Sequence, residues 1–252
     1  MSSNSLSIGV LLHPVQAIDI VGPIDILSNI SYEALEVFAS PQIVSNCKPP
    51  KIHFHYIGPT KEPAQLTGNI RLVPTCTLED CPKLDVLLIG GPMPDYARNL
   101  PADIRVFIQT KAKEVSSILT TCTGALVLAA TGLLGGLAAT VNQHPLIQTI
   151  AQEMSPSTKW DWRNHWVVAE SGGVKIWTAA GAGAGMDMCA QWIRANLAHG
   201  ETLLDFSTQM LEWQPRDVSG RMMKYVNGRG EVVEPNNIGY QAGLCSDANH
   251  HG

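Results

Sequence analysis

Residues 116–134 read SSILTTCTGALVLAATGLL, and this stretch decides the fold. Its first part is apolar and β-branched up to Thr121, and residues 123–131 are helix-like. Gly124, two residues after Cys122, permits a tight passage into this helix. A strand that breaks sharply into a helix is typical of the nucleophile elbow of α/β hydrolases. Here Cys122 takes the place of serine, although Thr120 replaces the first glycine of that elbow. The stretch therefore predicts a strand–turn–helix unit with a cysteine at its bend.

Such a bend has consequences for the chemistry of Cys122. Its side chain is expected at the carboxyl edge of a sheet, beside the positive end of the next helix, and that dipole favours the thiolate. A low thiol pKa follows from this reasoning. Most free cysteines are small buried hydrophobes, and Cys189 fits that description because it lies in an apolar helical pattern. The strand–turn–helix context favours a nucleophile at Cys122.

Outward from this segment, short apolar runs alternate with amphipathic stretches up to about Trp213. The alternation predicts an α/β fold, a three-layer, doubly wound, mostly parallel sheet with helices on both faces. Strands are expected at residues 6–12, 51–58, 85–89, 115–121, 166–169 and 174–178. Helices are expected at residues 19–29, 101–114, 123–131, 145–154, 185–197 and 202–213. Residues 67–82 are expected to form a small hairpin and loop.

Domain organisation follows from where the alternation stops. We expect a single α/β domain over residues 1–214. Residues 215–252 are polar, contain glycine and lack periodicity, so they are expected to form an irregular tail. Within the domain, the expected strand 85–89 ends on Gly90-Gly91, and a glycine pair at that position lets backbone amides approach a ligand closely.

Composition excludes several classes of protein. The chain has 252 residues, 45% of them hydrophobic and 15% charged, which is typical of a well-buried globular enzyme. Its net charge of -5 leaves no positive excess for a nucleic-acid partner. It has no apolar run of about 18 residues and no signal peptide, so we expect no membrane partner and a cytoplasmic location.

The six cysteines are scattered at irregular spacings, which is typical of reduced thiols. Cys76 and Cys81 form the one close pair. Without a second pair or a nearby histidine they make a weak zinc site, and no metal is expected.

Four stretches carry a resemblance to a known family. They are LLHPVQAIDIVGPIDIL at 11–27, LDVLLIGGP at 84–92, TTCTGALVLAATGLLGG at 120–136 and WTAAGAGAGMDM at 177–188. Through them the chain resembles the ThiJ/PfpI proteins of the class I glutamine amidotransferase-like superfamily, and most closely the isonitrile hydratase branch with its fungal relatives. The resemblance implies a flavodoxin-like or glutamine amidotransferase-like fold, a homodimer, a small-molecule substrate and no cofactor.

The resemblance also implies roles for single residues. Cys122 matches the family's nucleophile, and Thr123 follows it as in isonitrile hydratases. Asp19 matches the acidic residue that hydrogen-bonds the cysteine sulfur, although taken alone it is a typical helix N-cap. Gly90 and Gly91 match the loop whose backbone amides face the nucleophile, so these glycines and Thr123 are expected to bind the substrate.

Departures from the family pattern matter as well. Isonitrile hydratases usually have Thr-Thr-His-Trp where residues 140–143 read TVNQ, and a histidine arrives only at His144. Asn142 either lines the site through a hydrogen bond or caps the helix that follows. His13, His144 and His165 are more typical of structural or surface positions than of catalysis. A Cys–His hydrolase therefore has no obvious base.

Two further patterns have competing interpretations. The run 181–185, GAGAG, lacks the glycine at 186 that a dinucleotide loop needs, and the resemblance implies that it packs a helix near the nucleophile. Trp160, Trp162 and Trp166 either form the wall of an apolar pocket that suits a bulky apolar substrate, or fix a loop to the core.

The expected reaction is that of a hydro-lyase. Cys122 attacks an isonitrile, a thioimidate forms, and water converts it to an N-substituted formamide, with Asp19 as the proton donor. One alternative is another reaction of Cys122, such as a glyoxalase-type hydration of an α-oxoaldehyde or a lyase or cyclase step on a specialised metabolite. Another is a redox sensor in which Cys122 is oxidised to a sulfinic acid. Multiple turnover separates the enzymes from the sensor.

Overall fold

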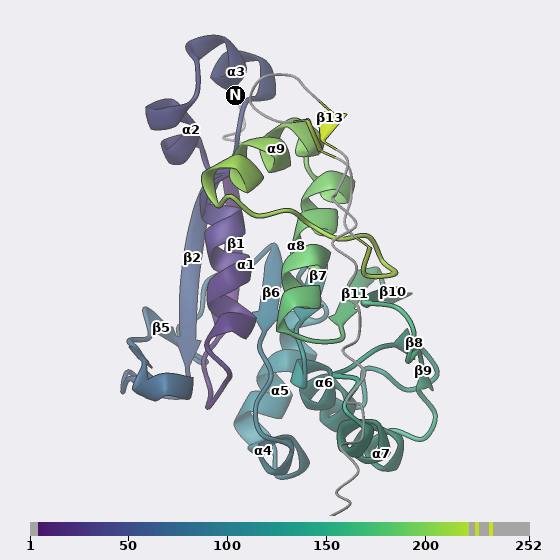
Figure 1. Ribbon diagram of the computed structural model, residues 1–252. Helices are drawn as coiled ribbons and strands as arrows, with labels where there is room; N and C mark the ends of the chain where they lie inside the picture. Colours follow the sequence, from purple (N-terminus) through teal and green to yellow (C-terminus); the bar gives the residue numbers. More distant parts are fainter. Residues whose placement is uncertain (1–4, 222–224, 227–231, 234–252) are drawn as a thin grey trace, which may run out of the picture.

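A seven-stranded sheet forms the centre of the molecule (Figure 1). The computed structural model describes residues 5–221, 225–226 and 232–233. The strand order is β10-β11-β7-β6-β1-β2-β5, and every pair is parallel except β10–β11. The predicted α/β class with a mostly parallel sheet is confirmed. The strands are β1 (Ser5–Leu11), β2 (Lys51–Gly58), β5 (Cys76–Thr77), β6 (Val86–Ile89), β7 (Ser117–Thr120), β10 (Trp166–Ser171) and β11 (Val174–Ala179).

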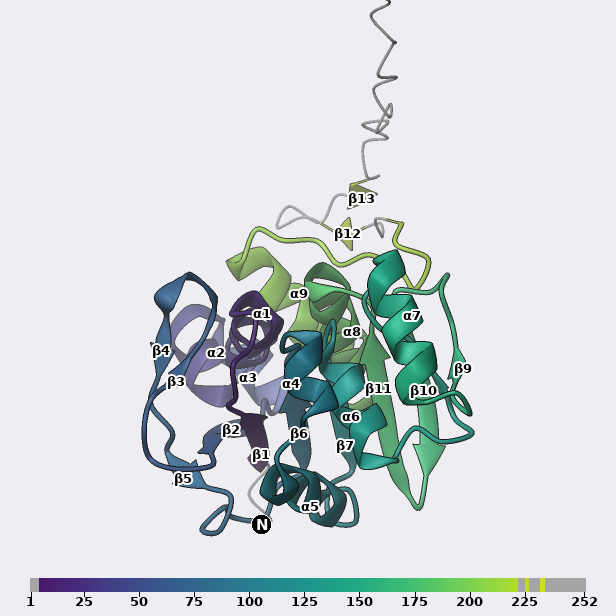
Figure 2. The same ribbon diagram turned by 90° about the horizontal axis from the view of Figure 1, so that it is seen from below.

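Helices cover both faces of this sheet (Figure 2). One layer packs through α1 (Ile18–Ser28), α8 (Ala182–Asn196) and α9 (Gly200–Met210), with the short helices α2 (Tyr32–Phe38) and α3 (Pro41–Cys47) at its side. The other layer contains α4 (Pro94–Arg98), α5 (Ala102–Lys111), α6 (Gly124–Thr131) and α7 (Pro145–Met154). None of the described helices combines the length and the apolar character needed to cross a membrane.

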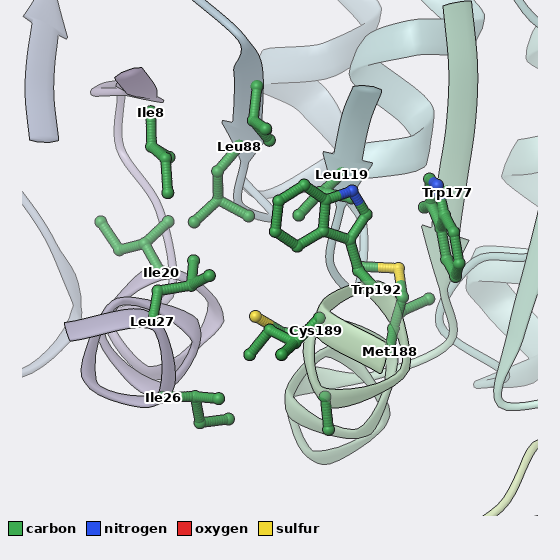
Figure 3. Close-up of a cluster of buried hydrophobic side chains, with 14 of the residues drawn as sticks. Ile8, Ile20, Ile26, Leu27, Leu88, Leu119, Trp177, Met188, Cys189 and Trp192 are labelled. Atoms are coloured by element: carbon green, nitrogen blue, oxygen red, sulfur yellow. The ribbon is translucent and has the colours of Figure 1, made fainter. Parts of the chain in front are cut away.

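The core lies between these layers. On the α1 and α8 side, Trp192 and Met188 meet Leu88 and Leu119 of the sheet (Figure 3). On the other side, α6 is buried around nearly its whole circumference, because it lies between the sheet and the helices α5 and α7. A helix in that position has to be apolar on all sides, as GALVLAAT is.

Some elements were missed by the periodicity argument. Helices α2 and α3 are only two turns long, too short to show a period, but serines at their N-caps mark their starts. The Ser31 hydroxyl accepts from the Ala34 N–H at 3.2 Å, and Ser40 precedes Pro41, a favoured first helical residue. Helix α4 was also missed, and α8 begins at Ala182 rather than at the predicted residue 185.

The predicted hairpin and loop at 67–82 is more structured than expected. Short strands β3 (Ala64–Gln65) and β4 (Arg71–Leu72) pair across the turn η1 (Thr67–Asn69), and β5 joins the edge of the main sheet. Two further short strands pair in parallel, β8 (Ala138–Ala139) and β9 (Lys159–Trp160).

The tail predicted to be irregular is ordered where the structure describes it. Arg216 binds Asp187, and the Asp217 side chain accepts from the N–H groups of Ser219 and Arg221 in a tight turn. β12 (Tyr225–Val226) and β13 (Val232–Val233) form an antiparallel pair. The rest of that predicted tail beyond residue 221 lies outside the described residues.

The strand order explains where chemistry can occur. β1, β6 and β7 are adjacent and parallel, so the segments that follow them meet at one edge of the sheet. These segments carry Asp19, the pair Gly90-Gly91, and Cys122.

Candidate active site

Cys122 occupies the bend between β7 and α6, as the sequence predicts. Its backbone φ is +55°, in the left-handed region that non-glycine residues seldom adopt, at a cost of about 1–2 kcal/mol. Gly124 explains how the turn stays tight, because a Cβ there would lie 2.5 Å from the Ile89 carbonyl oxygen. The side chain of Cys122 is buried, with 6% of its surface exposed. The fold thus holds this cysteine in a strained elbow, a feature common at functional sites.

Asn142 donates a hydrogen bond from Nδ2 to the Cys122 sulfur at 3.2 Å. Its other amide atom, Oδ1, accepts from the His144 N–H at 3.0 Å, at the N-cap of α7. The His144 N–H can only donate, so Oδ1 has to face it and Nδ2 faces the sulfur. Asn142 therefore contacts the nucleophile and also holds His144, the residue that caps α7. Its role in substrate binding stays a prediction.

Thr123 contributes its backbone. Its N–H hydrogen-bonds the Cys122 sulfur, which favours the thiolate. Its hydroxyl donates its single proton to the Pro92 carbonyl oxygen at 2.6 Å. Thr123 thereby ties the elbow to the loop that follows β6.

Asp19 lies in the first turn of α1 and is fully buried. Its Oδ2 accepts from the Gly91 N–H at 2.9 Å, and its backbone oxygen accepts from the Thr121 hydroxyl at 2.9 Å. Within the part of the chain that the structure describes, Oδ1 has no hydrogen-bond partner. Burial raises the pKa of Asp19 from 3.8 to about 6, and the Gly91 hydrogen bond offsets part of that rise. Asp19 can therefore exchange a proton near neutral pH.

The pKa of the Cys122 thiol is raised, and the low pKa expected from the sequence is wrong. Burial is the largest cause and the nearby charge of Asp19 is the second, while Asn142 and Thr123 lower the pKa. The helix dipole argument considered one favourable interaction and could not include desolvation, which the sequence does not show. The hydrogen bond from Asp19 to the sulfur that the resemblance implies is also absent between these two described residues, which interact through charge.

The Gly90-Gly91 loop comes as close to the elbow as expected. A Cβ at Gly91 would lie 2.5 Å from the Thr123 hydroxyl and 2.7 Å from Asp19 Oδ2. A Cβ at Gly90 would lie 2.4 Å from a methyl group of Val15. The amide of Gly91 is already bound to Asp19, so it positions the acid.

The three histidines have structural surroundings. His13 is buried and stacks on Tyr96 with the ring centroids 5.2 Å apart, and burial lowers its pKa to about 4. His144 caps α7 by accepting from the Leu146 N–H at 3.3 Å. Nδ1 of His165 faces Asp187 at 3.6 Å. Among the described residues, Asp19, Asn142 and Thr123 are the groups that shift the pKa of the Cys122 thiol, and none of the three histidines is among them.

The small residues at 181–185 begin α8 and bring it against the elbow. A Cβ at Gly185 would lie 2.4 Å from the Thr121 side chain, so only glycine allows this approach. Sequence reasoning missed Thr121, whose hydroxyl holds the backbone of Asp19. Its position next to Cys122 was the one available signal.

Trp160 and Trp162 stack on each other with their ring centroids 5.9 Å apart. Trp160 donates from Nε1 to the Ser155 carbonyl oxygen at 3.2 Å, which fixes the loop after α7. Trp162 lines an open depression of about 500 Å³ on the surface of α7, together with Gln148, Thr149, Gln152 and Glu153. Trp166 is buried in the core on the α8 side. A role of the first two tryptophans in substrate binding stays a prediction.

The sheet is doubly wound, a cysteine occupies a strained elbow and a buried carboxyl group lies nearby. These features are typical of α/β proteins whose site is built around a thiol. Comparison with known proteins then identifies the family. The DJ-1/PfpI family model matches residues 9–195, well over half of the chain. The chain belongs to the DJ-1/PfpI family.

Individual relatives agree with this assignment. The chain is 32% identical over 154 residues to the isonitrile hydratase of Pseudomonas putida, a match that covers 58% of this chain and 57% of that enzyme. A THiJ/PfpI family protein from Pseudomonas syringae has a similar structure, with a TM-score of 0.63, 21% identity and coverage of 84% of this chain and 76% of that one. Drosophila melanogaster DJ-1beta gives a TM-score of 0.61 at 16% identity, covering 83% and 98%. The two structural matches show the fold alone.

Proposed function

We propose that this protein is a cofactor-independent hydro-lyase that hydrates an isonitrile to an N-substituted formamide through a thioimidate on Cys122. The carrying observation is the pairing of a buried thiol with a buried carboxyl group whose pKa is about 6. The similarity to an isonitrile hydratase over part of the chain supports the substrate class.

The first step needs a proton transfer within the site. The thiol proton reaches Asp19 through one bridging water, since no direct hydrogen bond joins these two described side chains. The transfer leaves the net charge of the pair unchanged while it creates the nucleophile. The Cys122 sulfur then attacks the terminal carbon of the isonitrile, and Asp19 gives the proton to that carbon. The product is a thioimidate, R–N=CH–S–Cys122, beside an ionised Asp19.

The second step returns the site to its starting state. The Asp19 carboxylate takes a proton from water, whose oxygen adds to the thioimidate carbon, and Asp19 passes that proton to the nitrogen. The tetrahedral adduct, R–NH–CH(OH)–S–Cys122, then collapses. Its C–S bond breaks, its hydroxyl proton passes to the sulfur, and R–NH–CHO leaves with the thiol restored and Asp19 ionised. Asn142 stabilises the sulfur by its fixed hydrogen bond when the thiolate forms and when it leaves.

Residues around the sulfur favour this chemistry over amide hydrolysis. Hydrolysis of an amide by a Cys–His pair requires a base that also protonates a leaving amine. Asn142 takes the position at the sulfur and donates a hydrogen bond, but its amide cannot accept a proton at neutral pH. An isonitrile needs one proton at one carbon, and the single acid Asp19 can supply it.

A role as a redox sensor at Cys122 has less support. Sensor cysteines are exposed and have a low thiol pKa. Cys122 is 6% exposed and its pKa is raised. Another covalent reaction of Cys122, such as the hydration of an α-oxoaldehyde, would use the same groups. The choice of substrate in the assay below distinguishes it from isonitrile hydration.

We also propose that the protein works as a cytoplasmic homodimer, as the family resemblance implies. Two apolar side chains of α1, Ile18 and Val21, are 47% and 36% exposed beside Asp19. Burying them against a second copy would remove apolar surface from water. The test is the molar mass in solution by light scattering, and a monomer at working concentration would contradict the proposal.

The deciding experiment measures the loss of an aryl isonitrile and identifies the formamide as the product. Wild-type protein is compared with Cys122→Ala at equal concentration. Many turnovers by the wild type that vanish in the variant would support the proposal. An inert wild type that turns over an α-oxoaldehyde would replace the substrate class, and no turnover with either would overturn the enzymatic proposal.

A further inference from the structure

Asn142 lies in an irregular segment, although its amide makes a fixed hydrogen bond to the Cys122 sulfur. Residues 140–144 belong to no helix or strand. The short strand β8 leads into this segment, and β9, its parallel partner, leads into residues 161–164 (Figure 1). The two segments therefore leave neighbouring strands in the same direction. Residues 161–164 are placed to support the segment that carries Asn142.

Hydrogen bonds join the two segments. The Asp161 N–H donates to the last carbonyl oxygen of β8 at 2.8 Å. The Thr140 hydroxyl donates to the Asp161 carbonyl oxygen at 2.7 Å. Gln143 donates from Nε2 to the Asn164 carbonyl oxygen at 3.2 Å. Thr140 and Gln143 lie on either side of Asn142 in the sequence, so these contacts hold the segment before and after it.

The carboxylate of Asp161 gives residues 161–164 their shape. Its Oδ1 accepts from the N–H groups of Arg163 and Asn164 at 2.7 and 2.9 Å, and its Oδ2 accepts from Nδ2 of Asn164 at 2.8 Å. An aspartate that binds the backbone two residues further on closes a tight turn. Burial opposes the charge, but the bonds from Asn164 and Arg163 outweigh it and lower the pKa of Asp161. The turn therefore fixes the carbonyl oxygen that accepts from Gln143.

Asp161 reaches the thiol through this segment and not directly. It is not among the described groups that shift the pKa of the Cys122 thiol, whereas Asn142 lowers that pKa by its hydrogen bond. The start of the segment is also tied to the main sheet, because the Thr140 N–H donates to the Thr178 hydroxyl at 2.8 Å. Its other end is joined to the turn. A change in the turn should therefore shift Asn142 while the elbow stays in place.

We propose that Asp161 is a positioning residue of the active site, and that the turn closed by its carboxylate holds residues 140–143 so that the Asn142 amide donates to the Cys122 sulfur. Without the turn, the Asn164 carbonyl oxygen leaves its position and Asn142 spends less time at the sulfur. A thiolate that receives less stabilisation forms at a higher pH. Any effect on turnover rests on the proposed function, whereas the state of the thiol can be measured without a substrate.

The test is the pH dependence of Cys122 alkylation, whose rate follows the fraction of thiolate. Wild type, Asp161→Ala and Asn142→Ala are treated with iodoacetamide at a series of pH values, and the label on the peptide with Cys122 is measured by mass spectrometry. Asn142→Ala should raise the thiol pKa by about one pH unit, as expected for one hydrogen bond to an ionised group. Asp161→Ala should also raise it, by no more than Asn142→Ala does. In the double variant, the second change should add nothing.

Asp80→Ala is the matched control. Asp80 also closes a tight turn, since it accepts from the N–H and the hydroxyl of Thr77, but it lies next to β5, the edge strand farthest from β10. Its loss should leave the pKa of the Cys122 thiol unchanged. Asp161→Asn keeps an oxygen that can accept from the two backbone N–H groups. The thiol pKa of this variant should lie closer to that of the wild type than to that of Asp161→Ala.

Gln143→Met decides the matter if Asp161→Ala folds poorly, because it keeps the length of the side chain and removes only its bond to Asn164. It should raise the thiol pKa by a fraction of the Asn142→Ala effect. A wild-type thiol pKa in Asp161→Ala and Gln143→Met, or in Asn142→Ala, overturns the proposal. A shift in Asp161→Ala that adds fully to that of Asn142→Ala also overturns it, since Asp161 would then act by another route.

Discussion

Asp19 and Asp187 are both buried carboxyl groups on helices that pack against each other, yet their surroundings differ. Asp187, on α8, has both oxygens occupied. Oδ1 accepts from the backbone N–H of Arg216 at 2.9 Å, and Oδ2 accepts from the Nε of the same residue at 2.8 Å. Asp19, on α1, receives a single backbone hydrogen bond and has no cation beside it among the described residues.

The difference separates a structural carboxylate from a chemical one. The ion pair of Asp187 fastens the segment after α9 across the first turns of α8, where the guanidinium rests against Gly183. With both oxygens bound to one arginine, Asp187 is fixed in a structural ion pair. Asp19 has an unpartnered oxygen and a pKa near 6, which suits proton transfer.

The largest effect is expected from removing the nucleophile beside Asp19. Cys122→Ala should lower the turnover of an aryl isonitrile by at least ~10³-fold, because no covalent intermediate can form. Its unfolding temperature should stay close to that of the wild type. Cys189→Ala is the matched control, a buried cysteine on α8 outside the site, and should keep the activity. Activity that persists in Cys122→Ala would remove the basis of the proposed function.

The next largest effect should come from exchanging the two aspartates for asparagine. Asp19→Asn should lower kcat/KM by ~10²–10⁴-fold through loss of the proton donor, while Asp187→Asn should keep most of the activity of the folded protein. In the wild type, kcat/KM should fall below about pH 6, as a second proton binds to the Asp19–Cys122 pair. Equal losses of activity in Asp19→Asn and Asp187→Asn would contradict the assignment of Asp19 as the chemical carboxyl group and Asp187 as the structural one.

Stability should respond to pH through Asp19. Its pKa rises from 3.8 to about 6 on folding, so folding favours the protonated form. This stabilisation is complete below about pH 3.8 and is lost as the pH rises through about 6, at a cost of about 3 kcal/mol. Asp19→Asn should therefore unfold at higher urea than the wild type near pH 8, and the gap should narrow near pH 4. A variant that is less stable near pH 8 contradicts the burial of an ionised Asp19.

A smaller loss of stability is expected at the other carboxyl group. Arg216→Ala removes the partner of Asp187 and should lower the free energy of unfolding by about 2 kcal/mol. This loss of stability is moderate because the Arg216 guanidinium is partly exposed. Burial also raises the pKa of Asp187, so that its carboxylate can take up a proton when the arginine is gone. Urea unfolding measures this change. Arg221→Ala is a control, since Arg221 shares the segment but contacts Asp217 through its backbone. Equal losses in both variants would contradict the role given to the pair.

The smallest effect concerns the orientation of the sulfur. Asn142→Ala should lower kcat by about tenfold, as expected for one hydrogen bond to an ionised group of about 1.5 kcal/mol. Asn142→Asp should be worse than alanine, because its charge faces both the thiolate and Asp19. Steady-state kinetics decide the order of the two variants, and an aspartate variant as active as the wild type would show that Asn142 does not act as a donor.

The fold and the central site residues were accessible from the sequence. A strand signal that ends at Thr121 and a helix signal that starts at Thr123 leave room only for a tight turn at Cys122. The glycine pair at 90–91 marks the loop opposite. Parallel order then places the ends of neighbouring strands together. Position of the nucleophile therefore follows from local patterns and one topological rule.

The pKa values of the site residues and their side-chain contacts depended on the tertiary structure. The raised pKa values of Cys122 and Asp19 come mainly from burial, which depends on residues far away in the sequence. The hydrogen bond from Asn142 to the Cys122 sulfur joins residues 20 positions apart in the sequence, and the ion pair of Asp187 with Arg216 joins residues 29 positions apart. The period of the apolar residues distinguishes a helix from a strand and predicts which side chains face the core. Which buried carboxyl group receives a cation and which is left to carry a proton is set by long-range packing, and no local pattern encodes it.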